Sequence, residues 1–318
     1  MISATGQQFS LTLETAKGTW HATVAQLGAS LRVLKFNDLE LVEGYPEDWP
    51  APYCAGVVMA PWPNRTDGGK WTYDGQVRQF NINIVDQQNA NHGLLMDFPY
   101  ELVQKTESSV TLGATIYPRA AYPFLVETTV KYELVEGGLT VTHSAVNRSH
   151  AEAPYGVGGH PYFKFSADSS ENLIFTSNAA SVLMTDERQI PTHKAATAGT
   201  EYDSSKGRRL GDFFVDNDFT DLPRDEHGLA HTTLTLSPDY LAANAPVENT
   251  GLDVWQDANF GHVVFFTPGF YPTPEGLVHT AAIEPATCGP NALNTGDDLL
   301  WLKTDELWSG QWGVKLLH

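Results

Sequence analysis

The chain has 318 residues, of which 42% are hydrophobic and 18% charged, which suits a substantial core and argues against a disordered chain. It holds 19 Lys and Arg against 38 Asp and Glu, a formal charge of −19. Such an acidic chain repels phosphate backbones and anionic lipid, so nucleic acid and membrane surfaces are excluded as expected partners.

Alternating apolar and polar side chains predict antiparallel β-strands along much of the chain. In chain order, such patterns cover 71–73, 110–116, 126–134 and 139–145, with turn signals at Asp74-Gly75 and Glu136-Gly137-Gly138. The 27 glycines and 19 prolines are scattered, which is typical of many turns. We find no amphipathic helix longer than about three turns.

These patterns predict an all-β fold in one domain, 1–318, with around twenty short strands arranged as a large antiparallel β-sandwich. Its wide, open concave face could hold a ligand. The polar stretch 185–225 is the least regular part of the chain, and we interpret it either as a long loop or as a rim over a binding site.

Localisation follows from what the sequence lacks. No basic region followed by an apolar stretch opens the chain, and no apolar run reaches 18 residues. The two cysteines, Cys54 and Cys288, show no metal-type spacing. We therefore expect a cytoplasmic protein with reduced thiols and no metal.

Three segments carry side chains suited to chemistry. Asn64-Arg65 lies between prolines and a Gly pair, where a rigid backbone can aim a guanidinium at hydroxyls or carboxylates. His160 follows Gly158-Gly159, which would allow another group to approach closely, and precedes a proline. Glu284 ends an apolar run, so partial burial would raise its pKa toward that of a useful base.

Each of these residues also has a structural interpretation. The chain has eleven histidines, and any single one is more often structural than catalytic. His143 falls on the apolar face of a strand pattern and is predicted to be a core residue. His92, His160 and Glu284 gain weight only from their order and their flanking residues.

When the order of these segments and their flanking residues are taken together, the chain resembles the aldose 1-epimerase (galactose mutarotase) family over nearly its whole length. The elements that carry the resemblance are Asn64-Arg65, Asn89-Ala90-Asn91-His92-Gly93, His160-Pro161-Tyr162-Phe163, Asp216-Asn217-Asp218-Phe219 and Ile283-Glu284-Pro285. The resemblance implies a β-sandwich of the galactose-mutarotase type. It also implies an enzyme that interconverts the α and β anomers of a free aldose without a cofactor.

The resemblance assigns roles to individual residues. His160 would be the general acid at the ring oxygen and Glu284 the general base at the C1 hydroxyl, with His92 hydrogen-bonding near the ring oxygen. Arg65, Asn64 and Asp216 would bind the sugar, although Asp218 or Asp253 could replace Asp216. A histidine that titrates near neutrality and a glutamate with a raised pKa would suit this exchange.

Other functions remain open at this point. A hexose-6-phosphate 1-epimerase would use the same chemistry with a cationic pocket, for which Arg78, Arg119 and Arg188 are candidates. A non-catalytic carbohydrate-binding protein of the same fold would not need both His160 and Glu284. A glycoside hydrolase would need two carboxylates rather than a His–Glu pair. The expected partner is a small sugar, and the expected assembly is a monomer or a homodimer.

Overall fold

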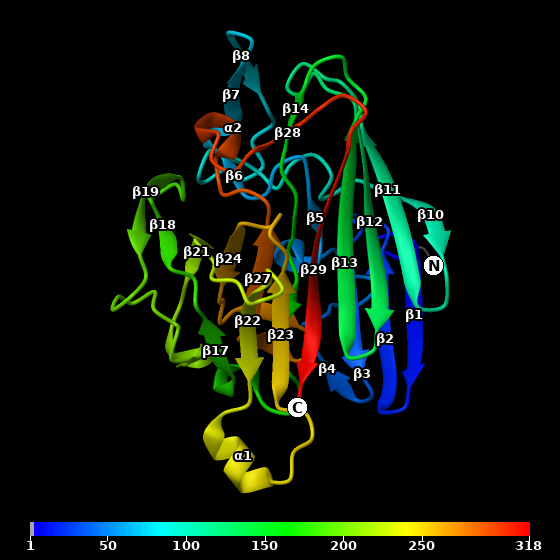
Figure 1. Ribbon diagram of the computed structural model, residues 1–318, viewed down its shortest axis with the longest axis vertical. Coiled ribbons are helices and arrows are strands. Elements are labelled where there is room, and N and C mark those ends of the chain that lie inside the picture. The colour runs from blue at the N-terminus through cyan, green and yellow to red at the C-terminus, as the bar shows by residue number, and fades with distance from the viewer. Residues whose placement is uncertain (1–2) are drawn as a thin grey trace.

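The computed structural model describes residues 3–318, and within them it contains 29 β-strands and two short α-helices, α1 (Pro238–Asn244) and α2 (Ala292–Thr295) (Figure 1). The long strands of one sheet stand on the right of Figure 1, and the shorter strands of a second sheet stand on the left. This arrangement confirms the predicted all-β sandwich, and all the strand pairs among these residues are antiparallel.

Two large sheets form the body of the molecule. The first has nine strands in the order β10 (Glu101–Lys105), β11 (Ser109–Ile116), β12 (Val126–Val135), β13 (Gly138–Asn147), β29 (Leu307–Leu317), β23 (Gly251–Gln256), β22 (Ala230–Thr235), β17 (Ile174–Ser177) and β20 (Arg208–Arg209). The second has eight, in the order β19 (Pro191–Ala196), β18 (Ser181–Thr185), β21 (Asp216–Thr220), β24 (His262–Phe266), β27 (Ala281–Ala286), β15 (Gly158–Gly159) and β5 (Val58–Met59), with β16 (Tyr162–Phe163) also paired to β27.

Smaller sheets complete the fold. A four-stranded sheet of β1 (Gln8–Thr15), β2 (Gly18–Ala25), β3 (Leu31–Phe36) and β4 (Leu39–Glu40) packs against β11 and β12. The two-stranded pairs are β6 (Arg65–Thr66) with β9 (Ala90–Asn91), β7 (Lys70–Tyr73) with β8 (Gln76–Gln79), β14 (Ala153–Tyr155) with β28 (Leu300–Leu302), and β25 (Tyr271–Thr273) with β26 (Gly276–Val278).

The predicted strands are confirmed where the alternation was strong. Strand β12 buries every second side chain from Val126 to Leu134 and pairs with both β11 and β13. Asp74 and Gly75, both at positive φ, turn the chain between β7 and β8 as the sequence predicts. His143 is buried and accepts a hydrogen bond from the indole of Trp312 at its Nε2, which confirms it as a core residue.

The prediction of a long loop at 185–225 was wrong in part, because this stretch forms the whole of strands β19, β20 and β21. Strand β19 lies at the edge of its sheet, and its side chains are half-buried or exposed. An edge strand with water on both faces needs no apolar alternation, so the sequence pattern could not reveal it.

The core fills the space between the two large sheets. Phe265 of β24 packs against Phe175 of β17, and Trp312 of β29 packs closely under Gly159 of β15. One face of the eight-stranded sheet is therefore committed to the core, which leaves its other face to carry a site. No helix within residues 3–318 is long and apolar enough to cross a membrane.

Candidate active site

Strand register places several polar side chains on the free face of the eight-stranded sheet. Glu284 lies opposite Val264, which lies opposite Asp218, and in the next row Ala282, Phe266 and Asp216 are aligned in the same way. Directly opposed residues of antiparallel strands point to the same side. The two acids of β21 therefore share a face with Glu284, while Phe265 and its row point into the core.

His160 joins this face from the segment after β15. Its backbone N–H donates to the carbonyl of Val57 and its carbonyl accepts from the N–H of Gly56, which fixes the residue at both ends. The imidazole Nε2 then lies 3.3 Å from Oε1 of Glu284, and both side chains are buried. The ring stacks on Tyr162, with centroids 5.2 Å apart.

Gly159 explains why the sequence has a Gly pair before His160. A Cβ at this position would lie 2.8 Å from a ring carbon of Trp312, closer than packed carbon atoms approach. The backbone that carries His160 can therefore sit directly on the core tryptophan only if residue 159 has no side chain.

His92 is brought beside His160 by the short β6–β9 pairing, in which Arg65 lies opposite Asn91. The rings of His92 and His160 meet edge to face with centroids 5.1 Å apart. The N–H of Asn64 donates to Nδ1 of His92 over 3.2 Å, so Nδ1 is an acceptor and the ring proton belongs on Nε2. Burial keeps the pKa of His92 well below its usual value, so the ring is a neutral donor.

Arg65 is held between two amides and a carboxylate. Its Nε donates to Gln87 over 2.7 Å, and its Nη1 donates to the Asn64 side-chain oxygen over 3.1 Å. Its remaining nitrogen, Nη2, lies 3.7 Å from Oδ2 of Asp216, which links the β6 segment to β21 across the site. The structure thus brings His92, His160, Glu284, Arg65, Asn64 and Asp216 together.

The electrostatics of the His160–Glu284 pair are dominated by burial. Burial raises the pKa of Glu284 well above its usual range, and the nearby Asp216 carboxylate adds to this. Burial lowers the pKa of His160 to about 4, so the expectation of a histidine near neutrality was wrong. Burial disfavours the charged form of each group, so a proton shared by the pair is favoured on the carboxyl over the imidazole. Within residues 3–318, neither Nδ1 of His160 nor Oε2 of Glu284 has a hydrogen-bond partner.

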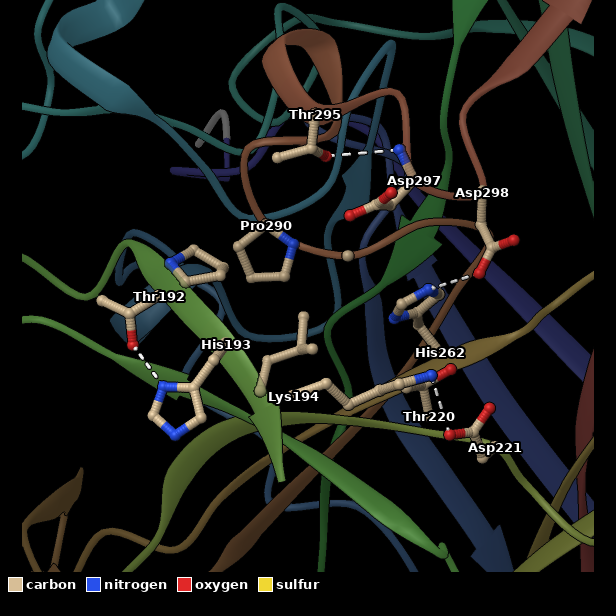
Figure 2. A pocket seen from close by; sticks show the side chains of 13 residues that line it. Thr192, His193, Lys194, Thr220, Asp221, His262, Pro290, Thr295, Asp297 and Asp298 are labelled. Atoms are coloured by element: carbon tan, nitrogen blue, oxygen red, sulfur yellow. Dashed lines mark hydrogen bonds and ion pairs between the residues drawn. The ribbon is translucent and has the colours of Figure 1, made fainter. Parts of the chain in front are cut away.

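Of the two alternative acids, Asp218 is engaged by a second histidine. Its Oδ2 lies 2.6 Å from Nδ1 of His262, whose Nε2 lies 2.9 Å from Asp298. Figure 2 shows His262 pointing to Asp298 at one end of a cleft of about 420 Å³, in which Lys194 is paired with Asp221. The two carboxylates raise the pKa of His262 to about 10 despite its burial, so it is an imidazolium that balances the Asp218 charge.

Asp253 does not belong to this site. It lies on β23 of the nine-stranded sheet, where its Oδ2 is 2.8 Å from Nδ1 of His231. Asp216 is the acid of the three that combines the sheet face of Glu284 with a contact to Arg65.

Sequence reasoning missed Gln87 and His262. Gln87 lies in a turn-rich stretch and carried no signal, because its side chain acts by accepting a hydrogen bond from the distant Arg65. His262 could have been found, since it is the one polar side chain in the apolar run 262–266. No cluster of three or more His, Cys, Asp or Glu side chains in the described part of the chain is arranged to hold a metal ion.

Solved structures with the same architecture define the fold class. The GalM/aldose epimerase homologue of C. elegans superposes with a TM-score of 0.81 over 98% of this chain and 99% of its own, at 17% identity. The galactose 1-epimerase of Lactobacillus acidophilus NCFM has a TM-score of 0.75 over 96% of this chain and 94% of its own, at 19% identity. The chain therefore has a galactose mutarotase-like fold.

Sequence comparison then identifies the family. The aldose 1-epimerase family profile matches residues 10–312. The uncharacterized protein YihR of Escherichia coli (strain K12) is 31% identical over 295 residues, which cover 92% of this chain and 89% of YihR. This protein belongs to the aldose 1-epimerase family.

Proposed function

We propose that the protein is an aldose 1-epimerase that interconverts the α and β anomers of a free aldose by acid–base ring opening and reclosure. The observation that carries this proposal is the contact of 3.3 Å between Nε2 of His160 and Oε1 of Glu284, two buried groups of opposite chemistry on one face. His262 is bonded to a carboxylate at both ring nitrogens, whereas Nδ1 of His160 and Oε2 of Glu284 have no hydrogen-bond partner in the described part of the chain. Free polar atoms on a buried pair favour a reacting site over a structural pair or a binding module.

The proposed reaction uses the one proton that His160 and Glu284 share. When His160 holds it, Glu284 is a carboxylate that accepts the C1 hydroxyl proton while His160 donates to the ring oxygen. The C1–O5 bond breaks, and an aldehyde and a C5 hydroxyl result. Rotation about C1–C2 and the reverse transfers close the ring on the other face, and the pair again holds one proton.

The remaining residues bind and orient the sugar. His92 offers its Nε2–H as a neutral donor beside His160, suited to the ring oxygen. Arg65 and Asp216 are the hydroxyl ligands, and Asn64 holds the Arg65 guanidinium in place through its amide oxygen. A neutral sugar needs such donors and acceptors, with little free positive charge.

Two of the three arginines considered for a phosphate pocket, Arg188 and Arg78, already have hydrogen-bond partners. Arg188 donates to Asp67, to Asn89 and to the carbonyls of Gln87 and Gln88. Arg78 donates to the carbonyl of Ala120. These contacts favour the free aldose over the hexose 6-phosphate.

The direct test is polarimetry of freshly dissolved α-D-glucose and α-D-galactose in phosphate-free buffer, with the protein and with its His160→Ala variant. We expect the protein to accelerate mutarotation of at least one sugar, and the variant to lose about 10²-fold or more of that rate. A folded variant with near wild-type rates would remove His160 from the mechanism, and no acceleration of either sugar would refute the proposed function.

A further inference from the structure

A second cleft adjoins the proposed sugar site, because Asp216 is among the residues that line it. It has a volume of about 470 Å³ and lies where β18 and β21 diverge beyond their pairing at Val182 and Phe219. The size is within the range of pockets that hold small organic ligands. The proposed chemistry at His160 and Glu284 does not use this space, because neither residue lines it.

Phe214 is the unusual side chain in this cleft. It is 64% exposed, although a phenylalanine would ordinarily be buried, and it lies two residues before Asp216. Its ring meets Phe266 edge to face with centroids 6.1 Å apart, and Phe266 shares the sheet face of Asp216. An exposed ring that is continuous with a binding face points to a ligand that covers it.

The rest of the lining indicates what that ligand is. Thr185, Gln189 and Asn217 contribute hydroxyl and amide groups. The Arg208 guanidinium stacks over Phe213 at 4.1 Å and donates to the carbonyl of Glu201, so the positive charge in the cleft already has partners. The lining also includes the acidic residues Glu201, Asp212 and Asp216. An aromatic face combined with hydroxyl, amide and carboxylate groups suits a neutral sugar ring, which has both C–H faces and hydroxyl edges.

We propose that this cleft is a subsite for a second sugar ring, and that the substrate is the reducing end of a disaccharide or longer oligosaccharide. The reducing ring would lie at His160 and Glu284, and the next ring would cover Phe214. This inference rests on the proposed function, because it needs the reducing ring to be turned over at that pair.

The test compares sugars that differ only in the second ring. Mutarotation of glucose is measured against maltose and cellobiose, and that of galactose against a galactobiose, by anomeric proton exchange in NMR spectra. The variants are Phe214→Ala, Phe214→Tyr and, as a matched control, Tyr117→Ala. Tyr117 is 65% exposed and does not line the cleft.

We expect kcat/KM of the wild-type protein to be higher for at least one disaccharide than for its reducing monosaccharide. Phe214→Ala should lower the disaccharide value about fivefold or more and leave the monosaccharide value within about twofold. Phe214→Tyr and Tyr117→Ala should retain the preference. Because Phe214 is exposed, its removal should not unfold the protein.

The outcomes separate this inference from the proposed function. The subsite would be overturned if the protein accelerates mutarotation of a monosaccharide without any preference for its disaccharides. A preference for a disaccharide that survives Phe214→Ala would also overturn it. In both cases the proposed epimerase function would stand. No acceleration of any of these sugars would overturn the proposed function itself.

Discussion

Replacing Glu284 with glutamine separates catalysis from stability. The Glu284 side chain is 3% exposed and its Oε1 lies 3.3 Å from Nε2 of His160, so bulk water cannot take over its role as base. A general base contributes about 10²–10⁴-fold, so Glu284→Gln should lower kcat by this factor, or about 3 to 5 kcal/mol of barrier. Glutamine has the same shape, so the fold should be retained.

The same substitution should lower activity but improve folding stability relative to the wild type as pH rises. Burial raises the folded-state pKa of Glu284, so above about pH 4.5 the unfolded chain releases this proton while the folded protein still holds it. Folding stability from this group therefore falls as pH rises through that window. Glutamine does not titrate, so we expect the Tm of the variant to gain on that of the wild type between pH 4 and pH 8.

The assays are polarimetry of α-D-glucose or α-D-galactose and thermal unfolding followed by circular dichroism. Glu133→Gln is the control, since Glu133 lies on β12 with a side chain 41% exposed and pairs with Lys131 on the surface. It should change neither rate nor Tm appreciably. The reasoning fails if folded Glu284→Gln retains a rate within about threefold of wild type, or if its Tm falls relative to wild type as pH rises.

Two further predictions concern His160 and the glycine before it. We expect kcat/KM to stay constant down to about pH 5 and then to fall toward the His160 pKa of about 4, because a second proton on the His160–Glu284 pair leaves no base. An acidic midpoint near 6.5, the usual value for histidine, would contradict the effect of burial on His160. Gly159→Ala should lower the free energy of unfolding by about 1–3 kcal/mol and also lower activity, because the new methyl group would lie 2.8 Å from the Trp312 ring. An unchanged urea midpoint and an unchanged rate would refute this packing argument.

The sequence by itself determined the strands that are half-buried and the motifs that carry the chemistry. The alternation from Val126 to Leu134 identifies a strand because one face packs on the core, and Asp74-Gly75 identifies a hairpin because the turn needs two positive φ angles. These are local properties with a period of two residues. The His160 and Glu284 segments likewise stand out from their immediate neighbours.

Only the tertiary structure decided how these residues meet. Asp216 and Asp218 are equivalent by alternation, yet one contacts Arg65 and the other pairs with His262. Nothing local distinguishes them, because the choice depends on strand order in the eight-stranded sheet and on side chains far away in the chain. The low pKa of His160 is likewise a consequence of burial, which arises only when the sheets pack together.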